Sequence, residues 1–586
     1  MLALALVQTT GGAAFAAEGR PNVILLMTDD QGHGDLSCHG NPVLKTPNLD
    51  KLHAESVRFT DYHVSPTCSP TRCALMTGHW TDRAGAWHTI SGRSLLRENE
   101  TTLGQIFAAG GYATGMFGKW HLGDNHPLRP EDRGFQEVMR HGGGGVGQTP
   151  DIWDNAYFDG AYFHNSKPEA VKGFCTDVWF DYARRFMESR AKAGKPFFAY
   201  IATNAPHGPY HAPVEFSEPY ADLGPATASF FGMIANIDAN VGKLRAWLAE
   251  SGLAENTLFL YTTDNGTAGG GKVFNSGMRG TKGSEYEGGH RVPLFVHWPA
   301  GGLTGGRDID TLTAHVDIAP TLIDLCGLPA PAGVKFDGRS LKPLLEGKTG
   351  DWPHDRALVT DSQRVLHPVK WKNSAVMSGA LRLVNGKELY DIKADPGQKR
   401  DIAAENPAEA ARLHAFYEAW WTELEPTFAE PVRVTVGNPA QELSVLTCHD
   451  WFTAGMTPWN HQAIRALKDK PDARGPWKIR VDSAGEYRIE LRRWPAESGA
   501  AIDEALPPGE DVPGVVAYRA HPGIPYPAVK ARLEVGGQSV ETAVQPGAAA
   551  AAFTVKLEAG PADLSGTFFD ADGGEQGAYY AYVRKL

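Results

Sequence analysis

The sequence predicts an α/β protein: a large, mixed but mostly parallel sheet flanked by helices, then a small α+β subdomain and an antiparallel β-sandwich. Up to about residue 330, short apolar runs alternate with helix-like stretches, and each run ends abruptly in polar residues and glycine. Continuous apolar runs joined by helical crossovers are typical of buried, mostly parallel strands. From about residue 430 the pattern changes to period-two alternation, which indicates antiparallel strands.

Four apolar runs define the predicted sheet and the edge at which polar residues gather. They are Asn22 to Met27, Tyr112 to Phe117, Phe197 to Ala202 and Leu258 to Tyr261. The polar residues that follow these runs are, in order, Asp29 and Asp30, Lys119 and His121, His207, and Asp264 and Asn265. In open α/β sheets ligands bind beyond the carboxyl ends of the strands, so we expect these side chains to converge.

The two later regions differ in pattern from the first. Residues 355–425 contain a strand-like pair with an Asn-Gly hairpin signal, followed by a helix-like stretch from Pro407 to Leu424. Beyond them, alternating apolar residues flank Ser483-Ala484-Gly485 and Gly536-Gly537, which predicts two antiparallel hairpins of a β-sandwich. The expected domains are therefore 18–354, 355–425 and 426–586, after a separate segment 1–17.

The segment 1–17 reads MLALALVQTTGGAAFAA, which is mostly apolar and ends in small residues. This predicts a signal peptide, although a basic n-region is missing, and a disordered N-terminal tail is the alternative. The segment is too short for a membrane span, and no later run reaches the ~18 apolar residues of one. We expect an exported protein, periplasmic or secreted, without a membrane span.

Composition narrows the class of protein further. The chain has 586 residues, 42% of them hydrophobic, so it can bury the cores of two or three domains. Its net charge of -12 argues against a nucleic-acid-binding protein, which would carry a basic domain. A small anionic substrate is still compatible with one basic pocket. Six cysteines are too few and too irregularly spaced for a disulfide scaffold.

The acidic and amide residues at the strand ends indicate a metal site. Asp29, Asp30, Asp264 and Asn265 offer hard oxygen ligands without an accompanying histidine or thiolate pattern, which suits Ca²⁺ or Mg²⁺. Each pair alone is more simply explained as a helix cap or a turn. The occurrence of both pairs at predicted strand ends favours the metal site.

Cationic and titratable residues accompany the predicted metal site. They are Arg72, Lys119, His121, His207 and Lys282. Lys119 and His121 are two residues apart, so they point the same way on an extended segment. Among 21 histidines any single one is more often a core or surface residue. Together these groups indicate a doubly anionic ligand such as a sulfate or phosphate ester.

Cys68 lies in the segment SPTCSPTRCALMTGHW, between Pro66 and Pro70 and one turn before Arg72. The prolines make its flanks rigid, and a helix that begins here would direct its positive end at residue 68. A catalytic thiolate fits this environment. However, no Cys-His-Asn spacing supports a thiol protease, and a thiolate matches a hard metal site poorly.

At these residues the chain resembles the type I sulfatases of the alkaline phosphatase superfamily. The Cys-X-Pro-X-Arg signature of that family appears as Cys68-Ser69-Pro70-Thr71-Arg72, and the similarity covers roughly residues 20–425. His79 departs from the family pattern, which usually has arginine there. The other matching segments are Asn22 to Gly32, Gly118 to Gly123, Ala205-Pro206-His207, Thr263 to Gly266, Lys282 to Pro293, Asp317 to Thr321, Leu389-Tyr390-Asp391 and Asp395-Pro396-Gly397.

The resemblance implies an alkaline phosphatase-like fold and an arylsulfatase-like sulfuric ester hydrolase. It implies that a formylglycine-generating enzyme converts Cys68 to formylglycine, whose hydrate is the nucleophile. One Ca²⁺ ion would be held by Asp29, Asp30, Asp264, Asn265 and residue 68, and Asp264 would help to deprotonate the nucleophile. Arg72, Lys119 and Lys282 would neutralise the sulfuryl oxygens, His207 with Lys282 would protonate the leaving alcohol, and His121 would accept a proton from the second hydroxyl.

Two alternative functions stay open, and the substrate is expected to be a small-molecule or oligosaccharide sulfate ester. The first alternative is a phosphonate monoester or phosphodiester hydrolase of the same superfamily. The second is a catalytically silent carbohydrate-binding protein that uses Trp451, Trp459, Trp477 and Trp494, although core packing explains these residues more simply. Candidate residues for the rim of the substrate site are His88, Arg93, Trp153, Asp154, Tyr157 and His164.

Overall fold

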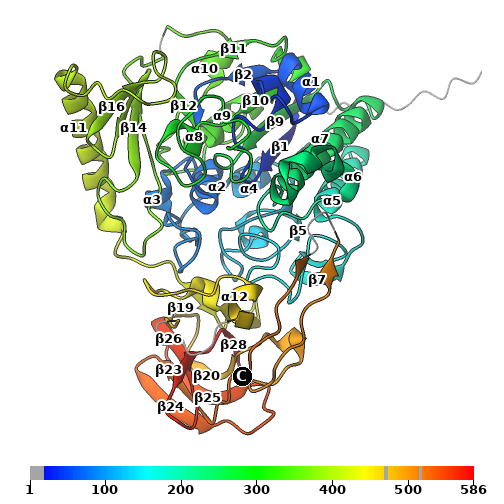
Figure 1. Ribbon diagram of the computed structural model, residues 1–586, viewed down its shortest axis with the longest axis vertical. Coiled ribbons are helices and arrows are strands. Elements are labelled where there is room, and N and C mark those ends of the chain that lie inside the picture. The colour runs from blue at the N-terminus through cyan, green and yellow to red at the C-terminus, as the bar shows by residue number, and fades with distance from the viewer. Residues whose placement is uncertain (1–18, 351, 467–472, 514–517) are drawn as a thin grey trace, which may run out of the picture.

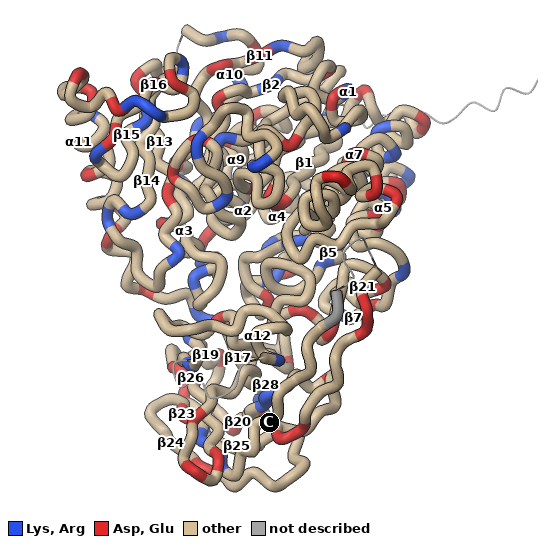
Figure 2. Tube along the Cα trace, viewed as in Figure 1, with Lys and Arg blue, Asp and Glu red and all other residues tan. Residues whose placement is uncertain are grey.

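The computed structural model describes residues 19–350, 352–466, 473–513 and 518–586, so the predicted signal peptide lies outside the described residues. Figure 1 shows a broad body formed by the first 430 or so residues and a tapering part formed by the rest. Acidic and basic residues are interspersed over both parts (Figure 2). In the described ranges, no helix is long and apolar enough to cross a membrane.

A ten-stranded mixed sheet forms the centre of the body. Its order is β11-β2-β10-β9-β1-β8-β4-β5-β6-β7. The five strands from β9 to β5 are all parallel to one another, whereas β10, β6 and β7 introduce antiparallel pairs. The strands are β1 (Asn22–Thr28), β2 (Val57–Phe59), β4 (Ala113–Gly118), β5 (Glu137–Arg140), β6 (Ala161–His164), β7 (Lys167–Ala170), β8 (Phe197–Ala202), β9 (Thr257–Thr263), β10 (Leu294–His297) and β11 (Asp308–Ile309).

Helices cover both faces of this sheet. Successive side chains of a strand point to opposite faces, so Val23, Leu25 and Met27 of β1 enter one core while Ile24 and Leu26 enter the other. The first core is covered by α2 (Cys68–Thr77), α4 (Leu103–Ala109), α9 (Ile318–Cys326) and α10 (Lys342–Leu345). The second is covered by α1 (Pro47–Glu55), α5 (Cys175–Lys192) and α7 (Pro225–Glu250). Apolar strands buried on both faces explain the continuous apolar runs in the sequence.

A four-stranded antiparallel sheet and one helix form the predicted α+β subdomain. Asn385 and Gly386, both with positive φ, close the hairpin that the Asn-Gly signal predicts. Arg382 joins this sheet to the body, since it donates to Glu287 and to Asp61 at 2.7 Å each. The elements are β13 (Ala357–Asp361), β14 (Ser374–Ser378), β15 (Leu381–Val384), β16 (Glu388–Asp391) and α11 (Pro407–Leu424).

Two further sheets share one core in the C-terminal part. One has the order β17-β19-β26-β23-β24, with β27 added to β26, and the other has the order β18-β28-β20-β25. The hairpin at Gly536-Gly537 is confirmed, because β23 pairs with β24. The strands are β17 (Val434–Val436), β18 (Leu443–Thr447), β19 (Trp477–Val481), β20 (Gly485–Arg492), β23 (Lys530–Val535), β24 (Gln538–Ala543), β25 (Ala551–Leu557), β26 (Gly560–Phe569), β27 (Glu575–Gly577) and β28 (Tyr580–Lys585).

The hairpin predicted at Ser483-Ala484-Gly485 is wrong. β19 pairs with β17 and β26, whereas β20 pairs with β25 and β28, so this turn carries the chain from one sheet to the other. Period-two alternation is the same for a strand in either sheet, and the partner is decided by packing over a long range. The predicted fold class, a mostly parallel helix-flanked sheet followed by separate antiparallel sheets, is confirmed.

Candidate active site

The polar residues that follow the four apolar runs meet at one edge of the large sheet. β9, β1, β8 and β4 are neighbours in the sheet, and their carboxyl ends lead directly into these residues. Carboxylate oxygens of Asp29, Asp30 and Asp264 lie within 4.8 Å of one another, and all three residues are buried. The convergence expected from the sequence is therefore present in the structure.

Two of the three carboxylates in this cluster each form an ion pair with a lysine. Lys119 donates to Asp29 Oδ2, and Lys282 Nζ lies 2.6 and 2.8 Å from the two oxygens of Asp30. Burial alone would raise the pKa of Asp30, but Lys282 and then His207 hold it below its usual range. Burial alone would lower the pKa of Lys282, but Asp30 raises it, so this lysine stays protonated.

Arg72 is fully buried and forms an ion pair with Asp264, the third carboxylate of the cluster. Its Nε and Nη2 donate to Asp264 Oδ2 at 3.1 and 2.7 Å, and Nη1 donates to the carbonyl of Lys119 at 3.1 Å. Burial alone would lower the pKa of Arg72, but Asp264 raises it. A planar guanidinium with several fixed partners holds the cluster in one geometry.

Two buried oxygens of the cluster indicate room for a cation. Asp29 Oδ1 and Asn265 Oδ1 have no hydrogen-bond partner among the described residues. Burial, and then the neighbouring Asp264, raise the pKa of Asp29. Because buried polar atoms normally have partners, these two oxygens are available to a positively charged ligand. Three carboxylates and an amide oxygen fit a hard cation such as Ca²⁺.

Cys68 is the first residue of α2 and lies next to the carboxylate cluster. Its Sγ is within 4.8 Å of ligand atoms of Asp29 and His207, and the side chain is buried. Burial raises the pKa of the Cys68 thiol, which disfavours the thiolate that an unmodified nucleophile would need. The carbonyl of Pro66 accepts a hydrogen bond from the backbone of Gly283, which ties the proline-flanked segment to the loop that carries Lys282.

The two predicted histidines differ in which ring nitrogen lies on a backbone carbonyl. His121, held at φ 59°, has Nε2 2.9 Å from the carbonyl of Thr89, so Nε2 carries the proton. Its Nδ1 is buried and has no partner within the described chain, which leaves a free proton acceptor. Gly144 packs so closely against this ring that a Cβ would lie 2.1 Å from His121 Cε1, so only glycine fits there.

In His207 it is Nδ1, and not Nε2 as in His121, that lies on a backbone carbonyl. Its Nδ1 is 2.6 Å from the carbonyl of Gly208, and its Nε2 lies 4.0 Å from Asp30 Oδ2. Burial, and then the Lys282 ammonium, lower the pKa of His207 to about 3. The imidazole is therefore neutral at pH 7 until an anionic ligand lies nearby, because a negative charge would raise its pKa.

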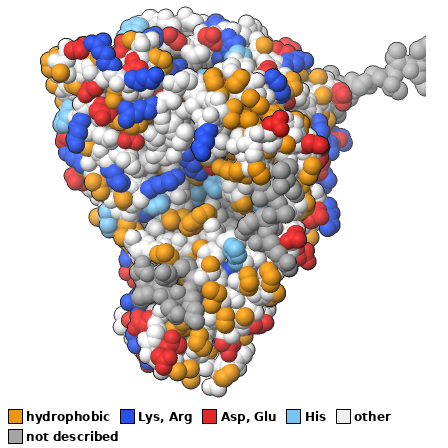
Figure 3. Space-filling view, viewed as in Figure 1, with side chains coloured by type: hydrophobic (Ala, Val, Ile, Leu, Met, Phe, Trp, Pro, Cys, Tyr) orange, Lys and Arg blue, Asp and Glu red, His pale blue; other side chains and the backbone are white. Residues whose placement is uncertain are grey.

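A cavity of about 970 Å³ extends from His207 toward the C-terminal part of the chain. Trp153, Asp154 and Tyr157 line it, as expected for rim residues. Its remaining lining includes Gln148, Asn155, His211, Trp459, Asn460, Gln462 and Glu510. Figure 3 shows Lys, Arg and His side chains gathered across the middle of one face of the molecule.

The other predicted rim residues have different surroundings. Arg93 is buried and donates to the backbone carbonyls of Leu366 and Phe428, which is a structural role. His164 lies between Glu137 and Glu169 on the edge hairpin β6–β7. Neither residue, nor His88, is among the described residues that line the cavity.

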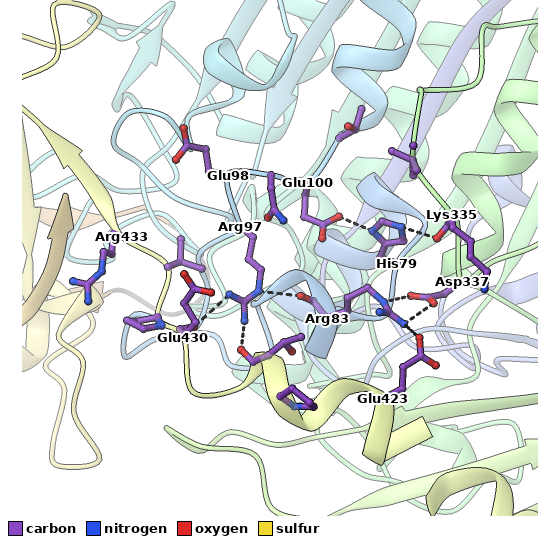
Figure 4. Close-up of a pocket in the computed structure, with 18 of the residues that line it drawn as sticks. His79, Arg83, Arg97, Glu98, Glu100, Lys335, Asp337, Glu423, Glu430 and Arg433 are labelled. Carbon is purple, nitrogen blue, oxygen red and sulfur yellow. Dashed lines mark hydrogen bonds and ion pairs between the residues drawn. The ribbon is translucent and has the colours of Figure 1, made fainter. Parts of the chain in front are cut away.

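His79 faces a separate, highly charged cavity of about 970 Å³ (Figure 4). Its Nδ1 lies 2.6 Å from Glu100 and its Nε2 lies 3.1 Å from the carbonyl of Lys335. Burial alone would lower the pKa of His79, but the hydrogen bond with Glu100 raises it. The departure from the family pattern therefore lies at the C-terminal end of α2, opposite the end that carries Cys68.

Sequence reasoning missed the exposed position of Trp459. Core packing explains Trp451, Trp477 and Trp494, which are 1 to 2% exposed, but Trp459 is 39% exposed. Trp459 and the buried Trp477 both follow a proline, so local sequence context does not separate the exposed tryptophan from the other three.

The fold agrees with the comparisons with known proteins. The model of the sulfatase family matches residues 21–328, and the model described as N-sulphoglucosamine sulphohydrolase, C-terminal, matches residues 281–415. The chain belongs to the sulfatase family and is a sulfuric ester hydrolase.

Three similar proteins illustrate the relationship. Arylsulfatase A of Homo sapiens is 35% identical over 58% of this chain and 70% of its own length. N-acetylgalactosamine-6-sulfatase of Canis lupus familiaris is 31% identical over 63% of this chain and 76% of its own. A solved structure, Ps i-CgsB in complex with k-i-k-neocarrahexaose, has a TM-score of 0.63 and 27% identity, and covers 69% of this chain and 93% of its own. The predicted family and enzyme class are confirmed.

Proposed function

We propose that this sulfatase hydrolyses the sulfate ester of a carbohydrate by means of formylglycine at position 68 and one Ca²⁺ ion. One observation carries the proposal: two partnerless buried oxygens, Asp29 Oδ1 and Asn265 Oδ1, belong to a carboxylate cluster beside Cys68. Asp29, Asp30, Asp264 and Asn265 would hold the ion together with residue 68. When bound, Ca²⁺ supplies positive charge that lowers the pKa of a coordinated hydroxyl and polarises the ester.

Residue 68 is the proposed nucleophile in its modified form. The hydrated formylglycine supplies two hydroxyls, one to attack sulfur and one whose proton loss restores the aldehyde after sulfate leaves. Asp264, which accepts a hydrogen bond from Arg72, would help to accept the first proton. His121, whose buried Nδ1 is a free acceptor, takes the second proton.

Three cations stabilise the charge that develops on the sulfuryl oxygens. Arg72, Lys119 and Lys282 lie on the carboxylates of the cluster, which supports their position next to the bound ester. Lys282 carries a proton, and His207 presents Nε2 to the same carboxylate. We propose that these two residues together deliver the proton to the leaving alcohol, with His207 charged only in the presence of the anionic ester.

A sulfated sugar is the proposed substrate because the cavity beyond His207 combines aromatic and hydrogen-bonding side chains. The name of one relative, N-acetylgalactosamine-6-sulfatase, supports a sulfated carbohydrate as the class of substrate. We also propose that the chain is exported, that a formylglycine-generating enzyme matures it, and that its domains are 18–354, 355–425 and 426–586.

Mass spectrometry of the tryptic peptide Phe59 to Arg72 tests the nucleophile, since Cys68 is its only cysteine. The protein is made in a host that has the maturation enzyme, and sulfate release from a panel of sulfated sugars and 4-nitrophenyl sulfate is measured in parallel. We expect an aldehyde mass at position 68 and turnover that Cys68→Ala abolishes while thermal unfolding stays near normal. Substantial activity of Cys68→Ala would refute the mechanism.

The same preparation separates the alternative functions. Comparison of kcat/KM on aryl sulfate, aryl phosphonate and phosphodiester substrates decides between a sulfatase and a phosphonate monoester or phosphodiester hydrolase. An unmodified thiol together with sugar binding and no turnover would favour the silent carbohydrate-binding protein.

A further inference from the structure

The cavity beside His207 has walls from two distant parts of the chain. One wall comes from residues 146–161 and 207–211 of the body, and the other comes from residues 459–462 and their neighbours near residue 510. Neither family model extends beyond residue 415, so the second wall lies outside the matched family regions. The surface that surrounds the leaving group is thus completed by a part of the chain that the family models do not describe.

The second wall is attached to the active-site loop through the backbone. Gln148 and Asn460 form an isolated antiparallel bridge, and the amide of Thr149 donates to the carbonyl of Trp459 at 3.0 Å. The amide of His461 donates to the carbonyl of Gly147 at 3.0 Å. These bonds hold the backbone of the tryptophan in a fixed position relative to the loop that packs on His121 and His207.

Side chains add a second attachment beside these backbone bonds. Helix α12 (His461–Ala466) carries Arg465, whose Nη2 lies 2.5 Å from Asp154 Oδ2. The Arg465 guanidinium also lies 4.7 Å above the ring of Trp153, and the ring of His461 lies 4.8 Å from the same tryptophan. Because Arg465 is buried, this ion pair fixes the helix against the rim of the cavity.

Trp459 is the aromatic side chain of this wall that stays open to solvent. A large exposed aromatic residue at a fixed backbone position, next to the amides of Asn460 and Gln462, presents an apolar face with polar groups around it. Sugar rings have the complementary surface, since their C–H faces are apolar and their hydroxyls project from the edges. A purely apolar ligand would cover these polar groups without adding hydrogen bonds to them.

His207 marks the end of the cavity that lies next to the carboxylate cluster. His207 is proposed to protonate the leaving alcohol, so the cavity that begins at His207 receives the carbohydrate part of the ester. Its volume of about 970 Å³ is at the upper end of the range of about 300–1,000 Å³ for small-molecule sites, which leaves space beyond one sugar ring.

We propose that Trp459 stacks on the sugar unit adjacent to the sulfated one, so that the C-terminal part of the chain selects oligosaccharides over monosaccharide and aryl sulfates. The inference rests on the proposed carbohydrate sulfatase function. It makes the C-terminal part a specificity element of the active site.

Steady-state kinetics on substrates of graded length test this inference. The probes are 4-nitrophenyl sulfate, sulfated monosaccharides, and sulfated galactan and glycosaminoglycan oligosaccharides of two, four and six sugars. The variants are Trp459→Ala, Trp459→Phe and a control, Met456→Ala. Met456 is 42% exposed three residues earlier and is not among the cavity-lining residues. Thermal unfolding is recorded for each variant.

In the wild-type protein, we expect kcat/KM for at least one oligosaccharide to exceed that for the corresponding monosaccharide. The ratio of kcat/KM for that oligosaccharide to kcat/KM for 4-nitrophenyl sulfate should fall about tenfold in Trp459→Ala, mainly through KM, because an aromatic contact and its buried area are lost. Trp459→Phe should retain most of this ratio, and Met456→Ala should leave it unchanged.

Two outcomes overturn the inference in distinguishable ways. If the wild type hydrolyses aryl or monosaccharide sulfates but prefers no oligosaccharide, or if Trp459→Ala keeps the wild-type ratio, the inference is wrong and the sulfatase function stands. If protein with formylglycine at position 68 releases sulfate from none of the probes, the proposed function fails and the inference fails with it.

Discussion

His207→Gln separates proton delivery from binding at the proposed active site. His207 is held by the carbonyl of Gly208 at 2.6 Å and presents Nε2 to Asp30, and glutamine can fill much of the same space without acting as an acid. General acids contribute typically 10²–10⁴-fold to rate, or about 3–5 kcal/mol of the barrier. Lys282 lies on the same carboxylate and stays protonated, so it provides a second donor and we expect a loss near 100-fold.

The leaving group decides how large this loss is. A sugar alkoxide is a poor leaving group and needs the proton, whereas 4-nitrophenolate leaves without it. We therefore expect kcat on a sulfated sugar to fall about 100-fold and kcat on 4-nitrophenyl sulfate to fall less than about tenfold. Both rates are measured on the same preparation, and thermal unfolding confirms that the variant is folded.

A matched control is His297→Gln on β10, a half-buried histidine whose Nδ1 lies 3.1 Å from the carbonyl of Glu55. This exchange should change neither rate by more than about twofold. Equal losses on both substrates in His207→Gln would refute the reasoning, because an effect on binding or on the geometry of the site does not depend on the leaving group.

Three further predictions concern the metal site and stability. Asn265→Ala removes a buried oxygen of the proposed Ca²⁺ site that has no hydrogen-bond partner among the described residues. Ca²⁺ is added back to EDTA-treated protein, and the concentration that gives half of the thermal stabilisation should rise at least about tenfold. An unchanged concentration argues against the site. Arg382→Met removes the buried cation that joins two carboxylates and should lower the free energy of unfolding by about 3–5 kcal/mol in urea titrations. A loss below about 1 kcal/mol would contradict the ion-pair argument. His79 has its pKa raised above 6.5 by the bond to Glu100, so its stabilising effect is complete below pH 6.5 and is lost as pH rises through the folded-state pKa. The difference in unfolding free energy between wild type and His79→Gln should therefore shrink from pH 6 to pH 9, and a constant difference would count against this pair.

The sequence alone predicts the main strands of the large sheet and most of the polar cluster at their carboxyl ends. The four apolar runs are strands β1, β4, β8 and β9, and their buried parallel arrangement requires the residues that follow them to lie at one edge. Asp29, Lys119, His207 and Asp264 were therefore predictable, because a strand end is a local property of the chain. The Asn385-Gly386 turn was predictable for the same reason, since its two positive φ angles are a local requirement.

The tertiary structure determines which strands of the C-terminal part pair and which of its aromatic residues stay exposed. β19 and β20 have the alternation of a hairpin but belong to different sheets, and four tryptophans of similar sequence context divide into three buried and one exposed. It also decided that residues 459–462 close the cavity beside His207. The physical reason is that alternation specifies which face of a strand is apolar, whereas the partner of that strand is chosen by packing between segments far apart in the sequence.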